Sequence, residues 1–82
     1  MIKVLFFAQL RDQLGVSELT LNSDQNPNVQ VLLENLKAQN TGWDKLLSKG
    51  TLMVAVNQTI SNKNATLVSG DEVAFFPPVT GG

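Results

Sequence analysis

The sequence predicts a small α+β domain in which one sheet of four to five strands carries its main helix on a single face. Segments rich in β-forming residues occur at both ends of the chain and after its middle. They lie at residues 2–8, 17–21, 52–57, 58–61 and 72–76. One long amphipathic stretch begins at residue 29, between the second and third strands. For a single domain of 82 residues, a two-layer roll is the simplest compact form of this pattern.

The first strand divides by parity into two faces, because neighbouring side chains on a strand point in opposite directions. One face is predicted to turn toward the core and carries Ile2, Val4, Phe6 and Ala8. The opposite face carries Lys3, Leu5, Phe7 and Gln9. Residues 10–14 are expected to form one or two helical turns before Gly15. The strand at 17–21 then runs antiparallel to the first, so the two make a hairpin with a wide connection.

The main helix is predicted to begin after Asn28, whose side chain is a good N-cap. Its apolar residues follow the helical i, i+3, i+4, i+7 spacing and are Val29, Leu32, Leu33 and Leu36. The helix should end near residues 40–42. A shorter helix is expected at residues 43–49, where Trp43 and the leucines that follow it fill the edge of the domain.

Two pairs of adjacent phenylalanines cannot both be buried by one covering helix. If Phe6 and Phe75 face the helix, then Phe7 and Phe76 must face away from it. Together with Leu5 and Ile60, the outward pair is predicted to form an exposed apolar patch of the kind found at protein interfaces. A loop or the short helix covering part of this surface is the alternative.

The end of the sequence predicts a tail at residues 77–82 after a folded domain at residues 1–76. Pro77 and Pro78 donate no backbone hydrogen bond, so strand pairing should stop there and the chain should project flexibly. Residues 79–82 can extend roughly 13 Å at about 3.3 Å each. Gly81 and Gly82 have no Cβ atom and can enter a channel that is too narrow for side chains. The terminal carboxylate is therefore the predicted reactive group.

Composition excludes several classes of function. The chain has no histidine and no cysteine, which removes the commonest general base, the thiol nucleophile and the usual zinc ligands. A net charge of −1 lacks the basic excess that nucleic acids attract. Gln9, Arg11 and Asp12 interrupt the apolar start before it reaches the length of a signal segment. We expect a cytoplasmic protein that uses neither nucleic acid nor a membrane as a partner.

Three segments resemble the family of small, sulfur-carrying subunits of molybdopterin synthase. They read MIKVLFFAQ at 1–9, AVNQT at 55–59 and GDEVAFFPPVTGG at 70–82. The resemblance spans the whole chain and implies a ubiquitin-like β-grasp fold. It also implies a carrier in which ATP and Mg²⁺, used by a separate activating enzyme, adenylate the carboxylate of Gly82. A sulfur donor then forms a thiocarboxylate, which delivers sulfur to cyclic pyranopterin monophosphate during molybdenum cofactor biosynthesis. The chain itself is expected to bind no cofactor.

The resemblance further implies three protein partners. They are the large subunit of molybdopterin synthase, an adenylyltransferase similar to ubiquitin-activating enzymes and a sulfur donor protein. It suggests a heterotetramer of two small and two large subunits. Phe7, Ile60 and Phe76 are expected to anchor the body on the large subunit, which supplies the catalytic side chains. The residues expected to direct the tail into that subunit are Pro77, Pro78, Val79 and Thr80, with Gly81 and Gly82 entering its active site.

Three other functions compete with this one. A sulfur carrier for thiamine or another thiolated product shares the fold and the terminal Gly-Gly. A ubiquitin-like modifier would instead join Gly82 to a lysine of a target protein. A free-standing enzyme would need acid–base chemistry from Asp12, Asp71 or Glu72, which are expected to be solvated surface charges. Arg11 and Asp12 receive no definite role.

Overall fold

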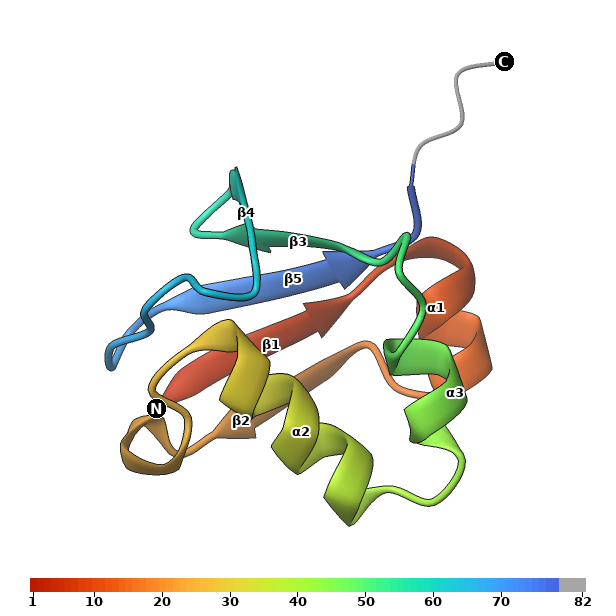
Figure 1. Ribbon diagram of the computed structural model, residues 1–82, viewed down its shortest axis with the longest axis horizontal. Helices are drawn as coiled ribbons and strands as arrows, with labels where there is room; N and C mark the ends of the chain where they lie inside the picture. Colours follow the sequence, from red (N-terminus) through yellow and green to blue (C-terminus); the bar gives the residue numbers. More distant parts are fainter. Residues whose placement is uncertain (79–82) are drawn as a thin grey trace.

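A five-stranded mixed sheet forms one layer of the molecule, seen in the computed structural model, which describes residues 1–78 (Figure 1). The spatial order of the strands is β2 (Glu18–Leu21), β1 (Ile2–Phe6), β5 (Glu72–Phe76), β3 (Met53–Val56) and β4 (Thr59–Ser61). The two central strands, β1 and β5, run parallel, and every other neighbouring pair is antiparallel. The two-layer α+β arrangement is thus confirmed, and the five strands lie within the predicted four to five.

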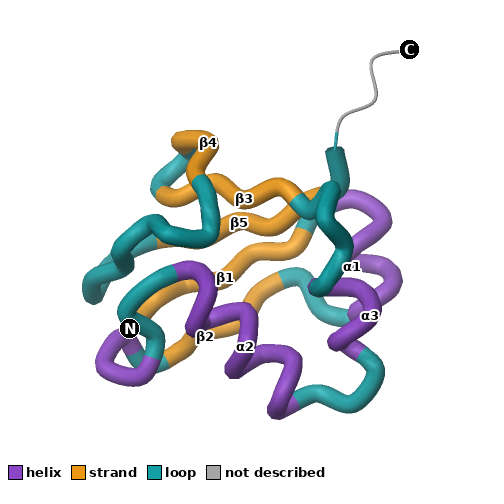
Figure 2. The backbone as a smooth tube through the Cα atoms, in the orientation of Figure 1, coloured by secondary structure: helices purple, strands orange, loops and turns teal. Residues whose placement is uncertain are grey.

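The helices form the second layer. They are α1 (Ala8–Leu14), a 3₁₀ turn η1 (Ser23–Gln25), α2 (Val29–Gln39) and α3 (Trp43–Leu47). In this view helix α2 crosses β1 and β2 obliquely, whereas α1 and α3 lie at the end of the sheet toward which β1 points (Figure 2). The chain reaches residue 78 at this same end, because the parallel strands β1 and β5 both finish there.

The core lies between these two layers. Phe6 and Phe75 are almost fully buried and stack with their ring centroids 6.1 Å apart. Trp43 meets Phe6 edge to face at 5.7 Å, so the short helix α3 closes the end of the core as expected. The apolar stripe of α2 is buried against them and consists of Val29, Leu32, Leu33 and Leu36. Burial of these aromatic and aliphatic groups is the main source of stability in a domain of this size.

Ala8 corrects the predicted face of the first strand. The parity pattern placed it in the core with Phe6, but β1 ends at Phe6 and Ala8 is the exposed first residue of α1. Its φ of 55° turns the chain out of the strand direction, so alternation no longer applies after Phe7. Helix α1 ends at Leu14 and is capped by Gly15, whose φ of 77° is readily adopted by a residue without a Cβ atom.

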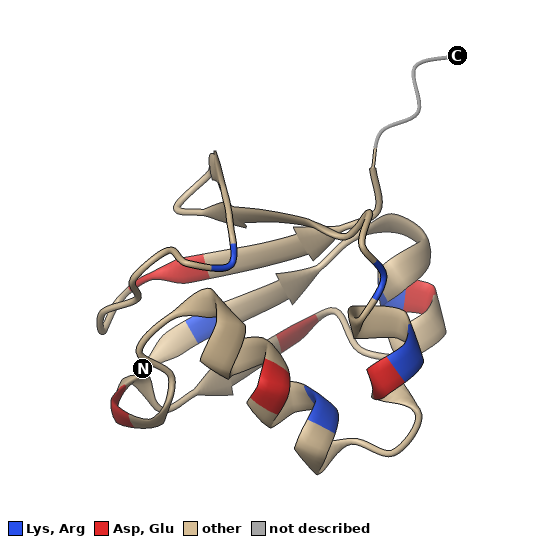
Figure 3. Ribbon diagram, viewed as in Figure 1, with Lys and Arg blue, Asp and Glu red and all other residues tan. Residues whose placement is uncertain are grey.

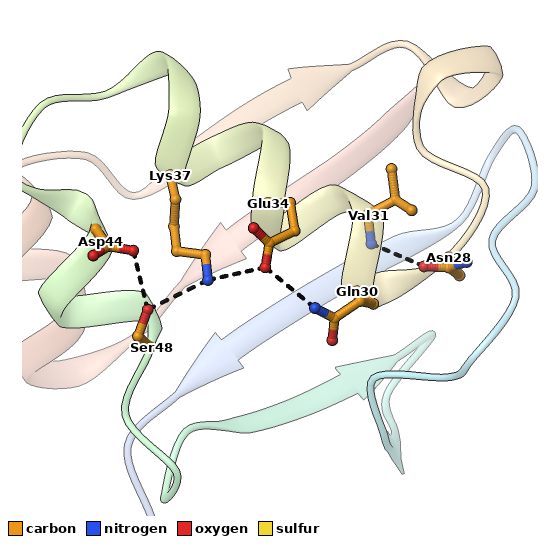
Figure 4. A network of polar contacts seen from close by, with 7 residues as sticks. All are labelled: Asn28, Gln30, Val31, Glu34, Lys37, Asp44 and Ser48. Atoms are coloured by element: carbon orange, nitrogen blue, oxygen red, sulfur yellow. Dashed lines mark hydrogen bonds and ion pairs between the residues drawn. The ribbon is translucent and has the colours of Figure 1, made fainter.

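Polar contacts fix α2 at its start and join it to α3 (Figure 4). The side chain of Asn28 accepts a hydrogen bond from the amide of Val31 at 2.8 Å, which confirms the predicted N-cap. Lys37 bridges the two helices, because its ammonium lies 3.1 Å from Glu34 and donates to the hydroxyl of Ser48 at 3.3 Å. Helix α3 is thereby held against the end of α2, beside the root of the tail.

Candidate partner interface

A row of apolar residues crosses four strands on the face of the sheet that the described helices do not cover. The strand register places Leu5 beside Ala74, Ala74 beside Ala55, and Ala55 beside Ile60. Their inward-facing neighbours Val4, Val54 and Val73 belong to the core, so this row points the other way. Ile60, on the edge strand, has 61% of its surface exposed.

A second apolar row lies next to the first, toward the end of the sheet where the tail begins. Met53 pairs with Phe76, and the amide of Phe7 donates to the carbonyl of Phe75 at 3.2 Å. Phe7 is 45% exposed, whereas Phe76 is partly buried among its neighbours. We call the two rows together the outer apolar face; its members are Leu5, Phe7, Met53, Ala55, Ile60, Ala74 and Phe76.

The outer apolar face brings together the three body residues predicted to contact a partner: Phe7, Ile60 and Phe76. Met53 belongs to the same surface but was not singled out from the sequence. The alternation of residues 52–57 was a usable signal for it, since Met53 shares its parity with Ala55. Phe76 and Leu5 are partly buried, so these side chains do not stand free in solvent.

The opposite end of the same sheet face is polar. Thr20, Lys3 and Glu72 are neighbours across β2, β1 and β5, and the amide of Asn57 donates to the carbonyl of Glu72 at 2.8 Å. An apolar partner surface would therefore be favoured only at the end where β1 and β5 finish. Because β5 ends there at Phe76, the outer apolar face leads directly to Pro77.

The root of the tail borders a groove of about 150 Å³. Pro77 is partly buried and Pro78 is exposed, and both line this groove together with residues of α1, α3 and the loop after α3. The remaining lining residues are Gln9, Leu10, Gln13, Leu46, Lys49, Thr51 and Leu52. Sequence reasoning did not identify the groove, because its walls come from separate segments that meet only in the fold. The predicted site residues Val79, Thr80, Gly81 and Gly82 lie outside the described residues.

Asp71 is held in a structural cluster at the far end of the sheet. Its carboxylate accepts hydrogen bonds from the side-chain amide of Asn57 at 3.0 Å and from the amide of Val68 at 2.9 Å. These donors, the Asn57 amide first, lower the pKa of Asp71 below its usual value. The side chain of Asn57 also accepts from the amide of Glu72 at 3.0 Å, so the carboxylate ties a turn to the start of β5.

Of the carboxylates considered for a free-standing enzyme, Asp12 lies apart from the adjacent Asp71 and Glu72. Asp12 lies on α1 at the tail end of the sheet, 3.9 Å from Arg11, and both side chains are largely exposed. Asp71 lies at the other end. It follows Gly70, whose amide donates to the carbonyl of Met1. Charged residues of both signs are spread over the visible helices and strand ends (Figure 3). Among residues 1–78, no group of three or more potential metal ligands is assembled, and no helix is long and apolar enough to cross a membrane.

Comparison with known proteins gives matches along the entire chain. Residues 4–82 match the ThiS family. The molybdopterin synthase sulfur carrier subunit of Escherichia coli is 49% identical over 82 residues and is covered completely, as is this chain. The corresponding subunit of Haemophilus influenzae is 44% identical, again with full coverage of both chains.

Solved structures share the fold. SAMP1 from Haloferax volcanii has a TM-score of 0.82 at 23% identity, covering 99% of this chain and 98% of its own. A complex of subunits 1 and 2 of the molybdopterin-converting factor from Helicobacter pylori contains a chain with a TM-score of 0.68 at 23% identity, covering 99% and 97%. The predicted ubiquitin-like β-grasp fold is thus confirmed. The chain belongs to the ThiS family, and its full-length relatives are sulfur carrier subunits of molybdopterin synthase.

Proposed function

We propose that this chain is the sulfur carrier subunit of a cytoplasmic molybdopterin synthase. The observation that carries the proposal is the outer apolar face, which ends at the edge where the chain leaves the sheet toward Gly81 and Gly82. A carrier needs a docking surface beside its reactive end, so that binding energy positions that end in the partner's active site. End-to-end identity of 49% with a sulfur carrier subunit supports the same function.

The chemistry takes place at the carboxylate of Gly82. A carboxylate is a poor electrophile, because its charge is shared by two oxygens and it has no good leaving group. Attack of this carboxylate on the α-phosphorus of ATP releases pyrophosphate and gives an acyl-adenylate, with Mg²⁺ neutralising the phosphate charge. Sulfide-level sulfur from a sulfur donor protein then attacks the acyl carbon, forming the C–S bond of the thiocarboxylate as the C–O bond to AMP breaks and AMP leaves. Both ATP and Mg²⁺ are used by the adenylyltransferase, and this chain contributes only the acceptor group.

Sulfur transfer follows in the large subunit of the synthase. The tail enters that subunit, whose side chains catalyse attack by the thiocarboxylate sulfur on cyclic pyranopterin monophosphate. Two loaded carriers supply the two sulfur atoms of the dithiolene, consistent with a heterotetramer of two small and two large subunits. The outer apolar face serves both the large subunit and the adenylyltransferase, so the two proteins bind one at a time.

Intact-mass analysis tests this proposal directly. The protein is incubated with its adenylyltransferase, ATP, Mg²⁺ and a sulfur source, and compared with a variant that lacks Gly82. We expect one oxygen-to-sulfur exchange in the complete chain and none in the shortened one. An unchanged mass of the complete chain, or equal sulfur incorporation in both proteins, would contradict the proposal.

The same samples separate a carrier from a protein modifier. A modifier forms an isopeptide bond and produces species of higher mass on a denaturing gel of cell lysate. A carrier gives a single band with an altered terminal group. A thiamine carrier is distinguished by its product, because the thiocarboxylate then fails to convert cyclic pyranopterin monophosphate when the large subunit is added.

A further inference from the structure

We propose that the groove at the root of the tail receives one apolar side chain of the large synthase subunit, whose neighbouring carboxylate pairs with Lys49. We call this surface the root groove. Its apolar lining is Leu10, Leu46, Leu52, Pro77 and Pro78, and its polar lining is Gln9, Gln13, Lys49 and Thr51. The inference rests on the proposed function, since it assigns a second contact to the partner that encloses the tail.

The size of the root groove matches a single side chain. Its volume is about 150 Å³, similar to that of an engineered apolar protein cavity of roughly 150 Å³ that binds benzene. Leucine and proline side chains make up much of its wall, so transfer of an aromatic or branched aliphatic group from water into it is favourable. A whole helix or strand is too large for this space, whereas one protruding residue fits.

The root groove continues the outer apolar face around the end of the sheet. Phe7 belongs to that face and is followed two residues later by Gln9 in the groove; Phe76 is followed directly by Pro77. Because Pro77 and Pro78 line the groove, a protein that contacts the outer apolar face and also binds the chain at these two residues lies next to the groove. This continuity identifies the occupant as the partner that takes up the tail rather than as an unrelated protein.

Charge at the root groove favours an acidic group on that partner. Lys49 forms no ion pair within residues 1–78, where the two ion pairs are Arg11 with Asp12 and Lys37 with Glu34. Among residues 1–78, it is the one ionisable residue that lines the groove. An opposing carboxylate would neutralise it as the partner excludes water, which strengthens the attraction between the two charges.

The test measures binding of the purified large subunit and, separately, of the adenylyltransferase from the same organism by titration calorimetry. Two substitutions address the groove: Lys49→Glu reverses its charge, and Thr51→Trp fills its volume. Both positions are exposed, so the fold should survive, and thermal unfolding checks this. Lys63→Glu is the matched control for the charge reversal, because the carbonyl of Lys63 lies near the start of α2 at the far end of the molecule. Thr41→Trp, in the exposed loop before α3, is the matched control for the added bulk.

We expect Lys49→Glu and Thr51→Trp each to weaken binding about tenfold or more, as is usual for a reversed or blocked interface contact. The controls should remain within about twofold of the unmodified chain. Equal affinity of all five proteins would overturn the inference while leaving the proposed function intact. Weakened binding to the adenylyltransferase alone would overturn the choice of occupant. Failure of the unmodified chain to bind the large subunit would overturn both the proposed function and this inference.

Discussion

Asp71 illustrates how one exposed carboxylate joins two parts of the sheet. Asn57 follows β3, and Val68 lies in the turn before β5; both donate hydrogen bonds to the Asp71 side chain. Charge-assisted hydrogen bonds of this kind are stronger than neutral ones. The residue therefore acts as a structural link between the end of β3 and the turn before β5.

The lowered pKa of Asp71 predicts a pH-dependent stability difference. A carboxyl group whose pKa is lower in the folded state stabilises the protein above its unfolded pKa of about 4, and the stabilisation is lost as the pH falls through the folded value. Asp71→Asn should therefore lower the free energy of unfolding at pH 7. The difference in free energy of unfolding between the variant and the unmodified chain should be smaller at pH 3. Urea unfolding at pH 7 and at pH 3 measures this difference.

Asp12→Asn provides the control for this experiment. The Asp12 side chain is 78% exposed and its nearest cationic partner is 3.9 Å away, so its removal should have little effect at either pH. A gap for Asp71→Asn that is as large at pH 3 as at pH 7 would show that the carboxylate charge is not what stabilises the link.

The β3–β4 hairpin carries a local conformational cost. Its two-residue loop is Asn57-Gln58, and both residues have positive φ, of 51° and 70°. This is the requirement of a type I′ turn, which favours Asn followed by Gly. Asn tolerates the left-handed region, whereas Gln lacks the short side chain that compensates for it.

Gln58→Gly should relieve this cost. We expect the free energy of unfolding to rise by about 1 kcal/mol, because the steric penalty of the left-handed region exceeds the added entropy of glycine in the unfolded chain. Thermal unfolding should then shift upward by roughly 4–8 °C. Gln30→Gly in α2 is the matched control and should lower stability by about 1 kcal/mol. A downward shift for Gln58→Gly would contradict the assignment.

Elements whose signals are local were predictable from the sequence. The last strand was predicted with the bounds that β5 has, and Asn28 marked the start of α2 correctly, because alternation and capping depend only on neighbouring residues. The 3₁₀ turn at Ser23–Gln25 was missed. It is held by the buried Asn26, which accepts from the side-chain amide of Asn35 at 2.9 Å. That contact joins a loop to a helix face, and no local sequence pattern predicts it.

At the scale of the molecule, the outer apolar face was predictable and the root groove was not. Parity alone assigns Phe7 and Phe76 to the side away from the helices, once Phe6 and Phe75 are placed inside. The groove depends on how α1 and α3 pack beside Pro77, which requires knowing the positions of three separate segments. Sequence patterns define the faces of an element, but hollows between elements come from tertiary packing.

One face of the sheet stabilises the fold and the other is proposed to bind the partner. Substitutions of the adjacent residues Phe6 and Phe7 test this difference. Phe6→Ala removes a buried ring that contacts Trp43 and Phe75, and should lower the free energy of unfolding by about 3–5 kcal/mol. Phe7→Ala, on the outer face, should change stability much less but weaken binding to the large subunit by at least tenfold. Thermal unfolding and calorimetric titration measure the two effects. The Phe6→Ala variant serves as the control for a general loss of fold. Unchanged affinity of the Phe7→Ala variant would show that this aromatic side chain does not belong to the interface.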